Sequence, residues 1–374
     1  MGFLRLYLAL CVVNAHTGNL FPWLAPRGRH AVELFFIISG FYMAMVLSGR
    51  YARVRDFYES RWLRIAVPYY VHMVAIVLLS VASGLIFSQW LSVSGFVGDP
   101  LERNGFWGIL FASLSNLTIF GQDLVLFLKD NAGSGLQFTP DFGAHPDPLY
   151  QFLIIPQCWS VSIELVFYLM APFLNRLKTR NLVVLLVVSA LARLAAYRLG
   201  GLDHDPWVYR FLPFELAWFV AGMLGWRLLT FIESKTGRGR TPGIAGYAVL
   251  CVMVVVIGAG FRWCYQALGP RIGEAYSGFF LILACVPLIL LAFHCTRSHH
   301  FDRLIGELSY PIYLNHLFFV VALRAIPSLE PFAPWLGLLT GVLSVLCAWL
   351  LWQFFLSRFE VRRHRTFGLA PLPT

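Results

Sequence analysis

The feature that most constrains this sequence is a series of apolar stretches, each close to the length that crosses a lipid bilayer as a helix. Such a helix needs about 20 mostly apolar residues. In lipid, every backbone N–H and C=O must find a partner within a helix or a closed barrel. The strict alternation typical of barrel strands is absent, so the stretches predict helices. They cover residues 3–16, 31–48, 65–87, 159–177, 182–199, 211–229, 244–260, 276–293, 304–326 and 336–356.

The composition agrees with a membrane protein and excludes other classes. Of the 374 residues, 58% are hydrophobic and 13% are charged, whereas about 25% of a soluble domain is charged. So apolar a chain is neither a soluble domain nor a disordered one. The formal net charge of +10 would suit a nucleic acid. However, the basic residues form short clusters between apolar stretches and no single basic face, so we expect no nucleic-acid partner.

An eleventh apolar stretch, residues 106–128, is interrupted by polar residues. Lys and Arg accumulate in the cytoplasmic loops of membrane proteins. If 106–128 does not span, most basic residues outside the spans fall on the side of the N-terminus, and if it spans, this asymmetry disappears. The sequence therefore predicts an all-α polytopic bundle of about ten transmembrane helices with both termini cytoplasmic. The stretch 106–128 is expected to be re-entrant or to lie along the outer surface.

The pattern predicts one integral membrane domain over residues 1–357 and a short basic cytoplasmic tail over residues 358–374. No soluble domain is evident. The seven cysteines include no CxxC pair, so they predict neither a disulfide framework nor a metal site.

Two polar residues of the first stretch, Arg5 and His16, are eleven positions apart. On a helix this spacing returns them to one face within about 20° and separates them by roughly 16 Å along the axis. Arg5 would lie near the inner side and His16 near the outer end. Glu33 opens the second stretch at the same outer end, so it is a candidate to pair with His16 and to fix its tautomer. The alternative is that Arg5 snorkels to headgroups, His16 caps its helix and Glu33 has no role.

Further polar residues mark the third, fourth and ninth stretches. Arg61 and Arg64 are three positions apart and share a helix face at the cytoplasmic side. They are either ordinary anchors or a clamp for phosphate groups. Glu164 lies about one turn into its span and needs a partner or a water-filled cavity. His316 follows a proline and is a hydrogen-bonded structural group or lines a cavity.

Taken together, these residues resemble the acyltransferase-3 family of integral membrane acyltransferases, which acylate surface polysaccharides, lipopolysaccharide, antibiotics and lipids. The resemblance covers nearly the whole chain, although Ala31 replaces a common glycine and Glu33 the more usual aspartate. It corresponds to a stand-alone form without an esterase-like domain. The matching marks, in chain order, are Arg5 and His16 at R-x10-H spacing, Glu33 in ELFF-x2-SGF, Arg61 and Arg64 in RxxR, Trp159 and Glu164 in WSxSxE, and Tyr310, Tyr313 and His316 in SYxIYLxH.

The resemblance implies an enzyme of a bacterial inner membrane that moves an acyl group, most commonly acetyl, from acyl-CoA to a hydroxyl of a glycan, glycolipid or other acceptor. It implies acyl-CoA as donor substrate and no permanently bound cofactor or metal. The competing interpretation is a transporter of a lipid-linked sugar or organic anion, because buried acids and histidines also suit proton coupling. The implied roles are phosphate binding by Arg5, Arg61 and Arg64, general base catalysis by His16, its orientation by Glu33 or Glu164, and substrate binding by Trp159, Tyr313 and His316.

Overall fold

The computed structural model describes residues 1–18, 20, 26–49, 51, 53–131, 135–236, 244–267, 273–297 and 299–368. Within these ranges, eight helical segments are long and apolar enough to cross a membrane. The two other predicted spans are also helical, as α1 (Gly2–Thr17) and α9 (Ile244–Ala267), although α1 is shorter than the eight. The predicted all-α polytopic bundle is therefore confirmed. The eight segments are Gly28–Leu47, Val54–Phe87, Pro156–Arg176, Thr179–Gly200, Leu212–Lys235, Tyr276–Thr296, His300–Arg324 and Pro327–Thr366.

Some spans are single helices and others are built from consecutive pieces. Pro287 opens α12, where it cannot donate to the preceding turn, and this explains the break between α11 and α12. The helices that build the spans beyond α1 and α9 are α2 (Gly28–Leu47), α3 (Val54–Phe87), α6 (Trp159–Arg176), α7 (Thr179–Gly200), α8 (Leu212–Thr236), α11 (Glu274–Ala284), α12 (Val286–Thr296), α13 (His300–Glu307), α14 (Ser309–Arg324), α15 (Leu336–Leu351) and α16 (Ser357–Thr366).

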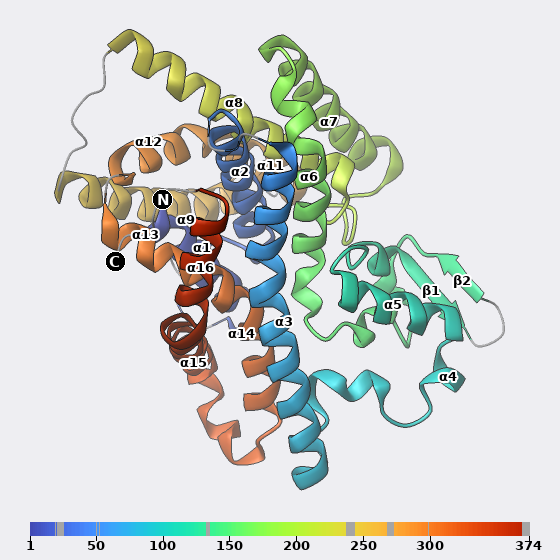
Figure 1. Ribbon diagram of the computed structural model, residues 1–374. Helices are drawn as coiled ribbons and strands as arrows, with labels where there is room; N and C mark the ends of the chain where they lie inside the picture. The colour runs from blue at the N-terminus through green and yellow to red at the C-terminus, as the bar shows by residue number, and fades with distance from the viewer. Residues whose placement is uncertain are drawn as a thin grey trace.

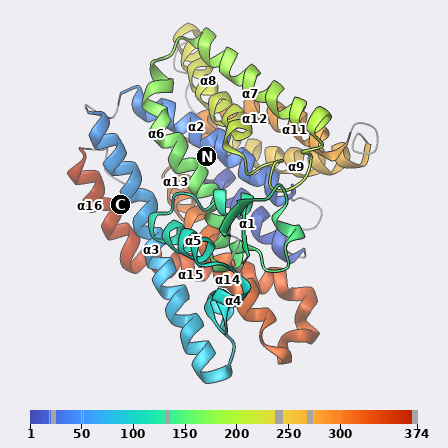
Figure 2. The ribbon, with the colours of Figure 1, turned by 90° about the vertical axis from the view of Figure 1, so that its right-hand side faces the viewer.

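The long helix α3 lies between two groups of helices in Figure 1, with α13 to α16 on one side and α6 and α7 on the other. The chain between α3 and α6 forms a small unit on the flank of the bundle, as both views show (Figures 1 and 2). This unit contains α4 (Pro100–Arg103), α5 (Phe106–Thr118) and the antiparallel strands β1 (Leu128–Asn131) and β2 (Gly135–Phe138).

The stretch 106–128 does not form one of the helices long enough to span, as predicted. Helix α5 ends at Thr118, and a turn leads into β1. Its start is held by Asp130, whose Oδ2 accepts a hydrogen bond from the backbone N–H of Gly108 at 2.6 Å. Its end is held by Tyr69 of α3, which donates to the carbonyl of Asn116 at 2.9 Å. The unit is therefore fixed to the side of the bundle.

Helices α2 and α8 pack with their backbones in direct contact. A Cβ atom on Gly40 would lie 1.9 Å from the carbonyl oxygen of Phe219, and one on Gly222 would lie 2.0 Å from that of Ile37. Small residues permit such close approach of membrane helices, where packing replaces the hydrophobic effect as the main source of stability. The two glycines therefore fix the distance between α2 and α8.

The segment from residue 358, which the sequence suggests is a basic tail, continues the last span as α16. Glu360 and Arg363 of this helix are buried. Arg363 donates to the hydroxyl of Ser60 on α3 at 2.6 Å. Residues 358–366 therefore pack against the bundle, while 369–374 lie outside the described residues.

Candidate active site

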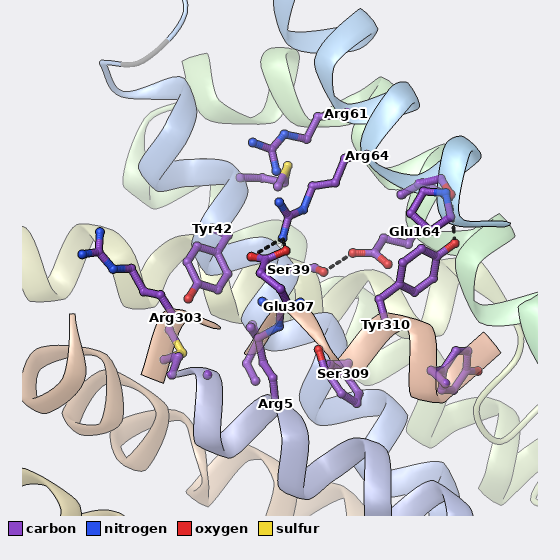
Figure 3. Close-up of a pocket in the computed structure, with 18 of the residues that line it drawn as sticks. Arg5, Ser39, Tyr42, Arg61, Arg64, Glu164, Arg303, Glu307, Ser309 and Tyr310 are labelled. Atoms are coloured by element: carbon purple, nitrogen blue, oxygen red, sulfur yellow. Dashed lines mark hydrogen bonds and ion pairs between the residues drawn. The ribbon is translucent and has the colours of Figure 1, made fainter. Parts of the chain in front are cut away.

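A cavity of about 520 Å³ lies between α1, α2, α3, α6, α13, α14 and α16. Arg5, Arg61 and Arg64 all line it, although they come from two different helices (Figure 3). The three cations that the sequence suggests for phosphate binding therefore lie around one space. We refer to this region of the cavity as its arginine end.

The arginine end contains more cations than the sequence motifs indicate. Six arginine side chains and four carboxylates line the cavity, which leaves an excess of positive charge. Arg297, Arg303 and Arg363 are the three that sequence reasoning missed. No signal separates them from ordinary cytoplasmic anchors, because Lys and Arg are common at that side of any polytopic protein.

Arg61 and Arg64 have different surroundings. Arg64 donates to both carboxylate oxygens of Glu307 at 2.9 Å and approaches Glu360 at 3.4 Å. Arg61 donates from its terminal nitrogen to the hydroxyl of Tyr51 at 3.2 Å. Its Nε is buried and has no hydrogen-bond partner among the described residues. A buried unpaired donor is costly, so Arg61 can still gain from an anionic ligand.

Helix α1, which carries Arg5, is held in place at its first turn. Both carboxylate oxygens of Asp302 on α13 accept backbone N–H groups there, from Gly2 at 2.7 Å and from Phe3 at 2.8 Å. These are donors that a helix leaves without partners at its start. Arg5 therefore projects from a fixed helix into the cavity (Figure 3).

Glu164 of α6 also faces the cavity. Its carboxylate accepts hydrogen bonds from the hydroxyls of Ser39 and Tyr168. Glu164 makes no contact with His16 among the described residues, so the structure does not bring these two predicted site residues together. Its partners instead tie α6 to α2 on the cavity wall.

The cavity extends to Ser160 and Tyr313, whereas His316 and His16 lie beyond Tyr313 and do not line it. The hydroxyls of Tyr313 and Ser160 are 2.7 Å apart. The ring of Tyr313 lies 5.8 Å from that of His316, and the ring of His316 lies 5.3 Å from that of His16. We call this group the histidine end. His316 is fully buried, and its Nε2 has no hydrogen-bond partner in the described structure.

Glu33 does not pair with His16, which corrects the prediction from sequence. Its carboxylate is fully buried and binds His30 Nδ1 at 2.8 Å and the guanidinium of Arg193 on α7. His30 lies one turn before Glu33 on the same helix, and residues at this spacing are neighbours. The short connection between the first two spans suggested His16 as the partner of Glu33, whereas the partner is His30.

Arg193 is the centre of a buried cluster that joins α2, α7 and α8. Its Nη1 binds Glu215 at 3.1 Å, its Nε donates to Tyr197 at 2.5 Å, and its Nη2 donates to Glu33 and to the carbonyl of Val208. The side chains of Arg193, Glu33 and Glu215 are each at most 2% exposed. A buried charge without partners would be very costly, so the cluster holds these helices in register.

Trp159, a predicted substrate-binding residue, is buried and does not line the cavity. The guanidinium of Arg210 lies 4.6 Å from its ring centroid, and the ring of Tyr209 packs against its edge. Sequence reasoning missed Arg210. The available signal was its place in a loop expected to face outside, where Lys and Arg are uncommon.

The structure thus defines a polytopic helical membrane protein with a cationic cavity that reaches from an arginine cluster to Ser160 and Tyr313. No group of three or more His, Cys, Asp or Glu side chains in the described residues could hold a metal ion. The sequence model of the family described as "Acyltransferase domain" matches residues 1–353. The chain belongs to this family and is a multi-pass membrane acyltransferase, as its sequence motifs predict.

Two relatives agree with this assignment. The chain is 27% identical to the "Exopolysaccharide production protein ExoZ" of Rhizobium meliloti, and the match covers 92% of this chain and 94% of the relative. It is 23% identical to the "O-acetyltransferase OatA" of Staphylococcus aureus over 98% of this chain and 58% of the relative. The chain thus spans little more than half of the second protein. No solved structure matches the chain.

Proposed function

We propose that this protein transfers an acyl group, most simply acetyl, from acyl-CoA to a hydroxyl of a glycan or glycolipid in a bacterial inner membrane. The observation that carries the proposal is the continuity of one cavity. It has an excess of arginines at one end and reaches Ser160 and Tyr313 at the other, where the ring of His316 lies between those of Tyr313 and His16. The names of the two relatives, one an O-acetyltransferase and one an exopolysaccharide protein, support a hydroxyl of a surface glycan as acceptor.

The arginine end suits the phosphate groups of the donor. Guanidinium groups bind phosphate through paired, charge-assisted hydrogen bonds. We assign this role to Arg5, Arg61 and Arg64, and we place this end at the cytoplasm, where acyl-CoA is available. The eleven positions that separate Arg5 from His16 correspond to roughly 16 Å of helix, a distance that the extended arm of the donor can cover.

At the histidine end, His16 acts as the general base. It takes the proton of the acceptor hydroxyl while the hydroxyl oxygen attacks the thioester carbonyl carbon. The carbon–sulfur bond then breaks, the new ester forms, and the departing CoA thiolate takes the proton back from His16. The side chains next to His16 are His316, by its ring, and Arg324, which donates to the His16 carbonyl, and neither is a carboxylate.

The test measures label transfer from radiolabelled acetyl-CoA into the glycan and lipid fractions of membrane vesicles that contain the protein. His16→Ala should lose nearly all transfer while the folded protein persists in detergent at normal yield. His145→Ala, a change at a half-buried loop position outside the cavity, is the matched control and should keep full activity. Substantial transfer by His16→Ala would refute the assignment of the base.

The same experiment separates the enzyme from a transporter. A carrier of a lipid-linked sugar would leave no label in any fraction, with or without His16. Buried acids and histidines suit both classes, but only a transferase leaves a covalent product. Absence of label with the unmodified chain would therefore refute the proposed function as a whole.

A further inference from the structure

The loop between α7 and α8 carries an arginine that the proposed mechanism does not use. Arg210 binds Asp205 through two parallel hydrogen bonds, from Nε to Oδ1 at 2.6 Å and from Nη2 to Oδ2 at 2.9 Å. Its guanidinium lies 4.6 Å from the ring centroids of both Trp159 and Tyr209, close enough for cation–π attraction. Its remaining nitrogen, Nη1, has no hydrogen-bond partner in the described structure. Arg210 is thus held firmly while two N–H donors remain available.

Tyr209 completes the arrangement of polar groups around Asp205. Burial raises the pKa of Tyr209 to about 12, so its hydroxyl stays protonated and donates to Asp205 Oδ2 at 3.0 Å. A carboxylate offers about four acceptor positions, and three are occupied by Arg210 and Tyr209. The Asp205 side chain is 35% exposed and that of Arg210 is 15% exposed. The pair therefore presents a donor and an acceptor side by side to an incoming molecule.

The pair lies beside the histidine end of the cavity. Trp159, which Arg210 covers, directly precedes Ser160, and Ser160 lines the cavity and contacts Tyr313. The charge of Arg210 lies within electrostatic range of His16 and of Tyr313. Arg210 and the arginine end therefore lie on opposite sides of the proposed site of acyl transfer.

The loop is anchored to the bundle by the buried cluster. The carbonyl of Val208 accepts hydrogen bonds from Arg193 and from the hydroxyl of Tyr197, the latter at 3.0 Å. Arg193 is itself fixed by Glu33 and Glu215. These bonds hold the backbone two residues before Arg210. The position of the guanidinium is thus set by buried side chains of three helices and not by a free loop.

We propose that Arg210 and Asp205 bind the acceptor, with Arg210 Nη1 donating to one oxygen and Asp205 accepting from a neighbouring hydroxyl of an uncharged sugar ring. This inference rests on the proposed function and names the acceptor side of the same site. The two side chains neutralise each other, so the pair offers no net charge to attract an acidic group. Adjacent donors and acceptors match the neighbouring hydroxyls of a neutral sugar.

The test compares variants in membrane vesicles that contain the source bacterium's own glycan as acceptor and radiolabelled acetyl-CoA as donor. Arg210→Met and Asp205→Asn should each lower transfer into the glycan at least tenfold, as expected for a lost charge-assisted hydrogen bond. The apparent KM for acetyl-CoA should stay within about twofold, because the donor binds at the other end of the cavity. Arg210→Lys, which keeps a cation and a donor, should recover part of the loss. Arg103→Met, an exposed residue at the end of α4 and outside the cavity, is the matched control and should transfer at the rate of the unmodified chain.

The outcomes distinguish the possible errors. Faster transfer by Asp205→Asn would mean that the acceptor carries an acidic group, and it would overturn the proposal. Unchanged transfer by Arg210→Met, or an equal rise in the KM for acetyl-CoA, would overturn it as well. If Arg210→Met does not fold, the transfer rates of Asp205→Asn and Arg210→Lys still test whether the pair binds the acceptor. Failure of the proposed function itself would be recognised separately, because the unmodified chain would then label nothing.

Discussion

The buried cluster around Arg193 gives a sharp prediction, since its two carboxylates are both fully buried but differently bonded. Both oxygens of Glu33 have partners, His30 Nδ1 at 2.8 Å and the guanidinium of Arg193. Only one oxygen of Glu215 has a partner, Arg193 Nη1 at 3.1 Å, and its Oε2 has none in the described structure. Glu33→Gln should therefore cost much more stability than Glu215→Gln, although both remove one negative charge and hardly change the shape.

The expected losses of unfolding free energy depend on which charged groups each variant leaves without a partner. Breaking a buried ion pair costs about 3–5 kcal/mol when the other charge is left unpaired. After Glu33→Gln, Arg193 keeps Glu215, so we expect about 3 kcal/mol, which is roughly a hundredfold in the ratio of folded to unfolded protein. Glu215→Gln leaves Arg193 with its better-bonded partner and should cost about 1 kcal/mol or less.

The assay is the unfolding of the purified protein in mixed micelles as the fraction of denaturing detergent rises, measured for both variants beside the unmodified chain. Label transfer from acetyl-CoA is measured on the same samples. The expected result is a lower unfolding midpoint for Glu33→Gln, with residual transfer in proportion to the folded fraction. A Glu33→Gln protein of normal stability that transfers nothing would refute the reasoning, because the carboxylate would then act in the chemistry.

The fold was largely predictable because the bilayer leaves few choices. A stretch of about 20 apolar residues can satisfy its backbone in lipid only as a helix or a barrel strand, and all ten stretches are helical. The interrupted stretch 106–128 was correctly separated from the spans by its polar residues. The short length of α1 and the packing of α16 against α3 depend on neighbouring helices. The hydrophobicity of a stretch does not indicate which helices are its neighbours, so neither feature could be predicted.

The candidate site was predictable where its residues share one helix. Spacing alone placed Arg61 and Arg64 on one face of α3, and both line the cavity. Pairs of residues on helices that are far apart in the sequence could not be predicted. The partner of Glu33 is Arg193, 160 positions away, and the sequence does not state which helices are neighbours. Arg210 could not be predicted for the same reason, because its proposed role depends on its contacts with Trp159 and Asp205.

Two further predictions test the cavity and the packing. Arg61→Gln should raise the apparent KM for acetyl-CoA at least tenfold without loss of folded protein. Arg64→Gln should also lower the folded yield, because it leaves Glu307 without its cation, whereas Glu360 keeps Arg363. An unchanged KM in both variants would mean that the two arginines only anchor the protein in the membrane. Gly40→Ala should prevent folding, since its Cβ would lie 1.9 Å from the carbonyl oxygen of Phe219 and neither backbone can yield without separating α2 from α8. Gly260→Ala is the matched control, because a Cβ there meets no atom within 4 Å and alanine favours a helix over glycine. Yield and size-exclusion profile in detergent measure both variants. A monodisperse Gly40→Ala protein at normal yield would show that the close contact between α2 and α8 is not required.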